Sequence, residues 1–452
     1  MTPRPYLIIA DAIAPLSATP SAIAATGLGR ALASAGHKTT ILSAASPDVA
    51  SQVPGLARRL RKVSTVVGAE TLELALYEGR APLSQAELLV LGAPTLGRAE
   101  TAAMFASAVR ALGGDGLLSA AVTIGWGETS AAALGVTSAS VRVFALPTGR
   151  LGPPLSASEK QILAPHLLGD DGAQSSLVAL GSLSANAIIA PSPSAARANE
   201  GDPGLSSRAS DEPFIGIRFG CDDPPHDPAS DPALPSPYSA ASLAGKAECR
   251  KALARRCSLA LGPRTLLLTA GPLFRDEGAE TILAGLERLE PWDVVTVVVP
   301  RGDRDLVERA RLLAIEHPGR VALLPDADVA QERFAHAAAD AILLGDDHDQ
   351  AGRSSGVALL YGTLPIVPNT GANRDYLVDY DQRSGTGHAV LYDLGSASGL
   401  ATAFGVESAV RRAISARADS DAWSSLVRSL FASAPRWSTT AAAVDEIATQ
   451  YA

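Results

Sequence analysis

The stretch Gly345–Asp381, GDDHDQAGRSSGVALLYGTLPIVPNTGANRDYLVDYD, decides the fold. An apolar strand, Ala341–Leu344, precedes it, and a carboxylate-rich loop leads to Gly352, which opens a predicted helix. The turn Tyr361–Thr363 leads into a second apolar strand, Leu364–Val367. Strand, loop, helix and strand in this order form the repeating unit of a parallel sheet. Ligands of such sheets bind beyond the carboxyl ends of the strands, which is where this loop is expected.

The same alternation of strands and helices continues on both sides of this stretch. The predicted strands of the second half are Thr265–Ala270, Val294–Val299 and Val321–Leu324, and its helices are Asp276–Leu289, Asp303–Glu316 and Asp328–Ala338. The first half opens with a strand at Tyr6–Ala10. Thr19 and Pro20 then cap a helix that ends at Ala35, and a second strand covers Lys38–Leu42. These patterns predict two doubly wound α/β domains.

Composition excludes several classes of protein. At 452 residues the chain is long enough for two domains, and its net charge of −9 argues against binding to a nucleic-acid backbone. No run of about 18 apolar residues predicts a membrane span, and the apolar run before Asp11 is too short for a secretion signal. Cys221, Cys249 and Cys257 show no metal-site spacing and suggest a reducing cytoplasm.

One segment predicts a boundary between the domains. Residues Asp222–Ser239, DDPPHDPASDPALPSPYS, are rich in Pro and Asp, a composition typical of linkers. We therefore expect an N-terminal domain over 1–222, a linker over 223–239 and a second Rossmann-like domain over 240–405. His226 within the linker is expected to be solvated.

The run YGTLPIV at 361–367, followed by Thr370-Gly371 and by VDYD at 378–381, resembles the donor-site region of bacterial glycogen synthases and starch synthases. The resemblance continues through PGRVAL at 318–323 and extends over about residues 6–451. Members of that family are GT-B glycosyltransferases, which extend an α-1,4-glucan from ADP-glucose or UDP-glucose. The resemblance implies a GT-B fold, with two Rossmann-like domains facing across a cleft and helices of residues 406–452 returning to the first domain.

Several positions that carry chemistry in the family differ in this chain. The resemblance places Ala18 where a phosphate-loop Lys is usual, and Gly127 where the second His of His-x-Trp-His is usual. Pro272 and Glu277 stand where an Arg and a Lys bind the donor diphosphate. Two unit charges about 4 Å apart interact by roughly 4 kcal/mol at an effective dielectric near 20, so a carboxylate at 277 opposes diphosphate binding. Arg275 is the nearby candidate for compensation.

The segment around Thr19 and Pro20 allows two interpretations. It reads as a plain helix cap, which we favour, or as an altered phosphate site. Pro20 has no backbone N–H to offer a phosphate.

The loop before Gly352 holds the candidate catalytic residue. The resemblance aligns Asp349 with a family Glu that approaches the donor sugar. Asp346, Asp347, His348 and Asp349 also fit a solvated acidic loop, which we favour, or a divalent-cation site. We therefore predict no metal and no cofactor. Gly352, Tyr361, Gly362 and Thr363 are candidate remnants of the donor site, although the Tyr-Gly-Thr turn also fits a purely structural role.

These observations support three hypotheses for function. The first is a glycogen-synthase-like protein that is catalytically silent and binds a glycan or regulates an active synthase. The second is a working glycosyltransferase with a rearranged donor site and another donor or acceptor. The third is a purely structural interaction protein. The expected partners are an α-glucan such as glycogen or an active glycogen synthase, with no nucleic acid and no membrane.

Overall fold

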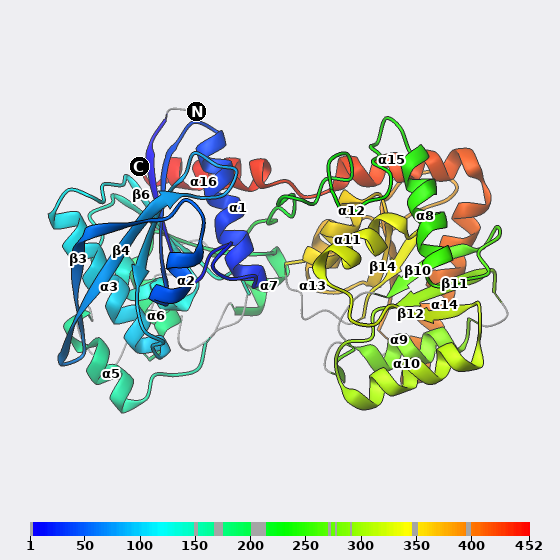
Figure 1. Ribbon diagram of the computed structural model, residues 1–452, viewed down its shortest axis with the longest axis horizontal. Coiled ribbons are helices and arrows are strands. Elements are labelled where there is room, and N and C mark those ends of the chain that lie inside the picture. Colours follow the sequence, from blue (N-terminus) through cyan, green and yellow to red (C-terminus); the bar gives the residue numbers. More distant parts are fainter. Residues whose placement is uncertain are drawn as a thin grey trace. The chain divides into compact units, whose positions relative to one another are not determined.

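The computed structural model describes residues 3–148, 152–166, 175–199, 214–269, 273–275, 278–289, 292–345, 351–394 and 399–452 (Figure 1). It divides into two compact units. Unit 1 comprises Met1–Gly220 and Arg436–Ala452, and unit 2 comprises Cys221–Pro435. Within the described ranges, no helix is long and apolar enough to cross a membrane.

The described part of unit 1 contains a nine-stranded sheet with the order β3-β4-β5-β2-β1-β6-β7-β8-β9. Its strands are β1 Pro5–Ala10, β2 Lys38–Ala45, β3 Ala57–Val67, β4 Glu70–Arg80, β5 Glu87–Gly92, β6 Val122–Trp126, β7 Val141–Ala145, β8 Ala187–Ala190 and β9 Phe214–Gly216. β4 runs antiparallel to both of its neighbours, and the other pairs are parallel. β1 lies between β2 and β6, so the chain order reverses between β1 and β6.

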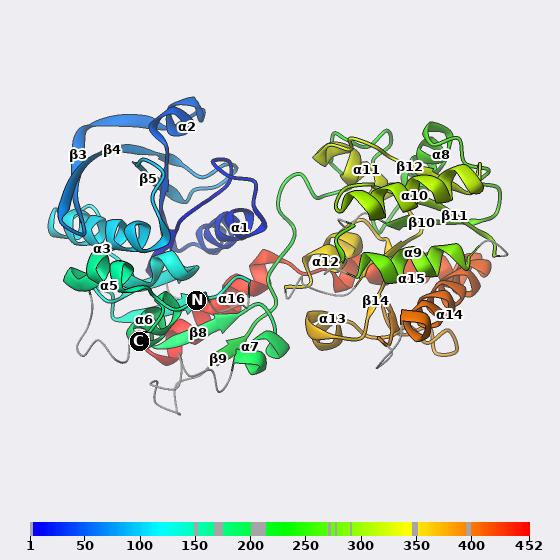
Figure 2. The ribbon, with the colours of Figure 1, turned by 90° about the horizontal axis from the view of Figure 1, so that it is seen from below.

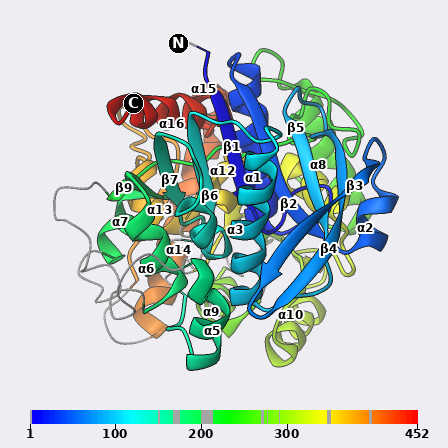
Figure 3. The same cartoon turned by 90° about the vertical axis from the view of Figure 1, so that its left-hand side faces the viewer.

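Helices cover both faces of this sheet (Figures 2 and 3). They are α1 Pro20–Ser34, α2 Pro47–Gln52, α3 Arg98–Gly114, α4 Ala131–Leu134, α5 Ala157–Leu163, α6 Leu177–Ser184, α7 Pro193–Asn199 and α16 Trp437–Gln450. Because side chains alternate along a strand, Ile8 of β1 packs in one core with α1 and α16. Leu7 and Ile9 pack on the opposite face with α3.

The described part of unit 2 contains a six-stranded parallel sheet with the order β12-β11-β10-β13-β14-β15. Its strands are β10 Thr265–Thr269, β11 Val294–Val298, β12 Val321–Leu323, β13 Ala341–Leu343, β14 Leu364–Pro368 and β15 Val390–Tyr392. Its helices are α8 Ala244–Arg256, α9 Ala279–Glu287, α10 Arg304–Glu316, α11 Val329–Ala338, α12 Arg353–Leu360, α13 Gly371–Tyr376, α14 Gly399–Ala418 and α15 Ser420–Ser433. The prediction of two doubly wound α/β sheets is confirmed.

The units divide the chain differently from the expected domains. Of the three C-terminal helices, α14 and α15 belong to unit 2 and α16 belongs to unit 1. Val406 of α14 packs against Gly285 of α9, where an added Cβ would lie 2.4 Å from a Val406 methyl carbon. The apolar face of α14 therefore completes the core of unit 2.

The Pro- and Asp-rich segment 223–239 is packed into unit 2. Asp231 and Tyr238 are buried. The Tyr238 hydroxyl donates to the carbonyl oxygens of Ala337 and Tyr361, at 3.1 and 2.8 Å. The expectation that His226 is solvated is wrong, because its ring is half-buried 6.3 Å from the Tyr361 ring. Composition indicated a linker because prolines and aspartates are also the residues of tight turns.

Candidate functional site

The strand order of unit 2 places its candidate site at the carboxyl ends of β10 and β13. β10 pairs with β11 on one side and with β13 on the other, so the chain order reverses between β10 and β13. Open α/β sheets bind ligands at such a reversal. The segments that follow these two strands contain Pro272, Glu277 and Asp349, and all three residues lie outside the described ranges.

Gly352 begins α12 in the left-handed conformation, with φ of +63°. An added Cβ would lie 3.3 Å from the Cβ of Ala372. The conformation therefore requires glycine, and the sequence argument was right that Gly352 opens the helix. Arg353, the first residue of α12, binds the Asp223 carboxylate through Nη1 at 3.0 Å.

Tyr361 is fully buried at the end of α12. Its hydroxyl donates to Oδ2 of Asp231 at 2.5 Å, and Asp231 also accepts from Arg333 at 2.9 and 3.2 Å. Burial, reinforced by the Asp231 carboxylate, raises the pKa of Tyr361. This hydroxyl therefore stays protonated and serves as a structural donor.

The buried ammonium group of Lys246 binds the backbone and side-chain oxygens of the turn Tyr361–Thr363. Nζ of Lys246 donates to the carbonyl oxygens of Ala337 and Tyr361 and to Oγ1 of Thr363, each at 3.0 Å. Ala337 and Tyr361 lie at the C-terminal ends of α11 and α12, where helix dipoles favour a positive charge. Burial lowers the pKa of Lys246 to about 7.

Gly362 completes the turn with φ of +60°. An added Cβ would lie 2.6 Å from Cε2 of Phe431 in α15. Tyr361, Gly362 and Thr363 thus each have a packing or hydrogen-bonding role within unit 2.

Arg275 follows β10 and is engaged by two carboxylates. Its guanidinium binds Glu280 at 2.8 Å and Asp305 at 2.6 Å, and all three side chains are exposed. Its backbone N–H donates to Asp303 at 2.9 Å. The compensating role predicted for Arg275 would require these ion pairs to break.

Three described arginines that follow the central strands of unit 2 share this feature, whereas Arg304, the first residue of α10 after β11, is exposed and forms no ion pair within the described ranges. Arg275 after β10, Arg301 after β11 and Arg353 after β13 are each paired with a carboxylate, and the Arg301–Glu332 distance is 2.8 Å. Sequence reasoning missed the pairs of Arg301 and Arg353. Their partners lie on segments that only the folded chain brings close.

In unit 1, the reversal between β1 and β6 gives the corresponding edge. Trp126 ends β6 with its ring buried, and Nε1 donates to the carbonyl oxygen and the hydroxyl of Ser21, both at 3.2 Å. Gly127 follows with φ of +83°, and nothing lies within 4 Å of an added Cβ. A side chain at this position would face open space.

The loop at Ala18 forms a helix cap. The Thr19 hydroxyl accepts from the backbone N–H of Ala22 at 3.3 Å, and Pro20 stands in the first turn of α1. This geometry is the plain cap that the sequence favoured. Ala18 is exposed and contributes no charge.

Sequence reasoning missed a charged network that begins one residue beyond Gly127. Burial raises the pKa of Glu128, Arg98 opposes that effect, and the nearby Asp11 adds to it. Nη1 of Arg98 lies 3.8 Å from Oε2 of Glu128. Glu128 lies two residues after the end of β6, and this position beyond the carboxyl end of a central strand was the available signal.

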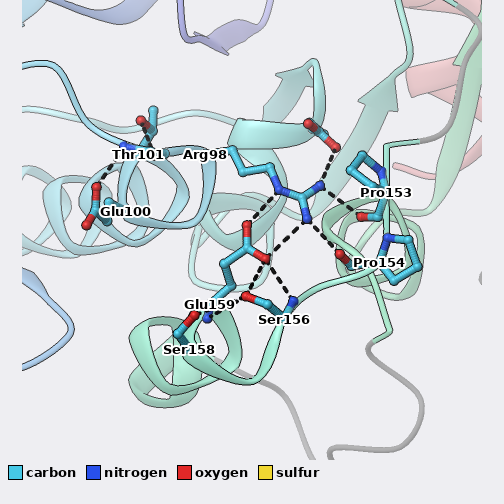
Figure 4. A network of polar contacts seen from close by, with 10 residues as sticks. Arg98, Glu100, Thr101, Pro153, Pro154, Ser156, Ser158 and Glu159 are labelled. Atoms are coloured by element: carbon cyan, nitrogen blue, oxygen red, sulfur yellow. Dashed lines mark hydrogen bonds and ion pairs between the residues drawn. The ribbon is translucent and has the colours of Figure 1, made fainter.

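Arg98 links the carboxyl edge of the unit 1 sheet to the segment before α5 (Figure 4). Its guanidinium donates to Glu159 at 2.7 Å and to the carbonyl oxygens of Pro153 and Pro154, each at 2.8 Å. Glu159 also accepts from the backbone N–H and hydroxyl of Ser156, both at 2.8 Å. Arg98 thereby positions the loop whose Gly152 lies close to the Glu128 carboxylate.

Comparison with known proteins identifies relatives over part of the chain. None of the protein-family models compared with the chain matches it. The glycogen synthase of Lacticaseibacillus casei (strain BL23) is 34% identical over 175 residues, which are 38% of this chain and 36% of that protein. The glycogen synthase of Anaeromyxobacter dehalogenans (strain 2CP-C) is 32% identical over 280 residues, 60% of this chain and 56% of that protein. The matches thus span about a third to just over half of these relatives.

The fold resembles a solved structure over the whole chain. The catalytic domain of starch synthase IV from Arabidopsis thaliana, bound to ADP and acarbose, gives a TM-score of 0.81 at 19% identity, and the match covers 100% of this chain and 99% of that domain. This similarity confirms the predicted GT-B fold class.

Proposed function

We propose that this protein, a divergent glycogen- and starch-synthase-like protein with the GT-B fold, binds an α-glucan or regulates an active glycogen synthase without transferring glucose from ADP-glucose or UDP-glucose. One observation carries the proposal. Three of the described arginines at the carboxyl edge of the unit 2 sheet, Arg275, Arg301 and Arg353, are each paired with a carboxylate.

Paired arginines are poor ligands for a nucleotide diphosphate. A diphosphate is bound by cations whose N–H groups point at its oxygens. Each of these three guanidinium groups would first have to leave a carboxylate, and that carboxylate would then repel the incoming anion. The substitutions Pro272 and Glu277, inferred from the resemblance, act in the same direction.

The Tyr-Gly-Thr turn supports the same conclusion. Lys246 and Asp231 account for the polar groups of Tyr361 and Thr363, and the close approach of Phe431 accounts for Gly362. These contacts give the turn a structural reason to persist without donor turnover.

The proposed ligand class follows from the relatives. The curated relatives are glycogen synthases, and the starch synthase IV structure holds acarbose. We place the protein in the cytoplasm, because its three cysteines, Cys221, Cys249 and Cys257, form no disulfide.

The test compares two kinds of binding in the same purified protein. Calorimetry with ADP should show no binding at sub-millimolar concentration, whereas the protein should co-sediment with glycogen. ADP-glucose or UDP-glucose supplied with glycogen should release no nucleotide diphosphate above background, with an active bacterial glycogen synthase as positive control. Turnover near 1 per second, a typical enzymatic rate, would refute the silent assignment.

Glu128 supports a second candidate, an active glycosyltransferase with a rearranged site. Its carboxyl group has a raised pKa, follows a central strand and stands beside open space at Gly127. A panel of nucleotide sugars tests this alternative. Transfer or hydrolysis that Glu128→Gln abolishes would favour it over the silent protein.

A further inference from the structure

The first half of β3 forms an exposed basic strip at the margin of unit 1. β3 is the edge strand of the nine-stranded sheet, beside β4 (Figure 3). Residues 57–62 read ARRLRK, and all six are exposed. The second half of β3 differs, because Val63 packs in the core beneath α3. Along β3 the strand therefore changes from fully exposed to partly core-facing.

A bulge pushes the centre of this strip outward. Arg58 pairs with Tyr77 and Lys62 pairs with Ala75, so three residues of β3 stand opposite one residue of β4. Leu60 is the middle residue of the three, and its side chain is 105% exposed. A bulge of this kind redirects side chains and breaks the regular edge that another strand would need for pairing.

The four cations of the strip have different partners. Arg59 pairs with Glu78 of β4, and Arg61 pairs with Asp115, which follows α3. Among the described residues, Arg58 and Lys62 form no ion pair. These two cations flank the exposed Leu60 on either side of the bulge.

We infer that the strip Arg58–Lys62 is a docking surface for another protein, whose acidic rim surrounds an apolar socket for Leu60. The occupant follows from charge and apolarity together. A chain with a net charge of −9 here presents Arg58 and Lys62, which form no ion pair among the described residues, on either side of Leu60, and this complements an acidic surface. A polyanion such as polyphosphate would neutralise the cations and leave Leu60 in water. A protein socket with an acidic rim would neutralise the cations and also bury Leu60.

A second copy of this chain fits less well. A symmetric dimer places the same patch of both subunits in contact, so the cations of one strip would face the cations of the other. A different protein avoids this repulsion. The inference is independent of the proposed function, because it uses none of the residues at the carboxyl ends of the strands in either sheet.

Defined peptides can test the surface without knowledge of the natural partner. One fluorescent peptide alternates Glu and Leu, a matched peptide alternates Glu and Ser, and polyphosphate serves as a pure polyanion. Anisotropy titrations at low and high salt would use the full chain, Leu60→Ser, and the double variant Arg58→Glu with Lys62→Glu.

Matched variants control for charge and for apolar area. Arg255→Glu with Arg256→Glu changes the net charge equally at two exposed positions of α8, and Ile315→Ser removes an exposed apolar side chain of α10. Because all these side chains are exposed, each variant should remain folded; only the two charge reversals in the last turn of α8, where the helix dipole favours positive charge, should lower the unfolding midpoint slightly. Thermal unfolding therefore separates lost binding from misfolding.

The full chain should prefer the Glu/Leu peptide to the Glu/Ser peptide and to polyphosphate. Leu60→Ser should lower affinity for the Glu/Leu peptide about tenfold, consistent with losing one buried leucine. The charge-reversed pair should lose binding together with its salt dependence. Arg255→Glu with Arg256→Glu, and Ile315→Ser, should bind like the parent.

Three results would overturn the inference. Equal affinity for polyphosphate and the Glu/Leu peptide, insensitive to Leu60→Ser, would leave only a non-specific anion strip. If no probe binds, the strip Arg58–Lys62 is not a docking surface. A concentration-dependent dimer in sedimentation that Leu60→Ser abolishes would assign the strip to a second copy of this chain.

Discussion

The Asp231 carboxylate binds the Arg333 guanidinium through two hydrogen bonds, 2.9 and 3.2 Å long, across 102 positions of sequence. Both groups are buried, and Tyr361 donates a third hydrogen bond to the same carboxylate. This ion pair fastens the Pro- and Asp-rich segment to α11 and α12. The segment is therefore part of the core of unit 2 rather than a solvated tether.

Removing the Asp231 charge should destabilise unit 2 strongly. Asp231→Asn keeps the side-chain shape but leaves the buried Arg333 without its counter-ion, which costs roughly 3–5 kcal/mol. Urea unfolding followed by far-UV circular dichroism measures the change. Asp305→Asn is the matched control, because its pair with Arg275 is exposed and should cost less than about 1 kcal/mol. Equal effects of the two changes would contradict the structural role of Asp231.

Lys246 predicts how the stability of unit 2 depends on pH. Its pKa is about 7 in the folded chain and about 10.4 in an unfolded one. Between these values the unfolded state binds more protons, so the free energy of unfolding rises with pH, by up to about 1.4 kcal/mol per unit. Below pH 7, Lys246 is protonated in both states, and its burial lowers the free energy of unfolding by the full amount. Above the pKa of the unfolded chain, this destabilisation is absent.

A pair of lysine variants isolates this effect. Urea midpoints measured between pH 7 and 10 should rise in the parent and rise less in Lys246→Met. Lys38→Met removes an exposed ammonium group and should keep the slope of the parent. If Lys246→Met retains the parent slope, the ammonium group is held protonated by its three oxygen partners and the prediction is wrong.

Gly362 and Gly385 form a matched pair for the turn after α12. Both adopt positive φ, +60° and +69°, and this conformation costs a non-glycine residue about 1–2 kcal/mol. Only Gly362 is also crowded, by Phe431, whereas nothing lies within 4 Å of a Cβ at Gly385. Crowding in a packed core costs typically 1–3 kcal/mol more. Gly362→Ala should therefore lower the free energy of unfolding about 3 kcal/mol, and Gly385→Ala about 1 kcal/mol.

The measurement is again urea unfolding of the two variants beside the parent. Similar losses would show that the positive φ dominates and that Phe431 moves aside without cost.

The elements of the fold were predictable because their signals are local. Thr19, Pro20 and Gly36 mark the ends of α1, and continuous apolar runs mark the buried parallel strands. Helix α15 was not distinguished among the helices expected over residues 406–452, although the Asp419 side chain caps it by accepting from the backbone N–H groups of Asp421 and Ala422. The turn Tyr361–Thr363 was placed correctly, but its buried partner Lys246 could not be, because it lies more than 100 positions away.

The candidate site was less predictable, because its chemistry depends on pairing. The sequence shows Arg275 beside the substituted positions, and this suggested a cation available to a diphosphate. Asp305, on α10, binds the Arg275 guanidinium, so this cation is no longer available to a diphosphate. No residue near Arg275 in the sequence indicates the pair with Asp305. The fold is specified by patterns within a segment, whereas the charge state of a site is specified by which segments meet.

The last prediction separates the two causes proposed for weak diphosphate binding. Glu280→Gln with Asp305→Asn should release Arg275 while leaving the fold intact, because all three side chains are exposed and such pairs contribute little to stability. Pro272→Arg with Glu277→Lys should instead restore the cations that the resemblance places there. ADP binding by calorimetry would be measured for the parent, each double variant and the combined quadruple variant.

The change at Glu277 alone alters the local charge by two units, so Pro272→Arg with Glu277→Lys should raise ADP affinity at least a hundredfold above the undetectable parent. Releasing Arg275 should give a smaller gain, because its guanidinium must still reorient toward the ligand. The quadruple variant should bind most tightly, yet less tightly than an active glycogen synthase, because Ala18 and Pro20 still provide neither charge nor N–H. Micromolar ADP binding by the unaltered protein would contradict both causes at once, and Arg275→Gln in that protein would then show whether Arg275 leaves its carboxylates for the ligand.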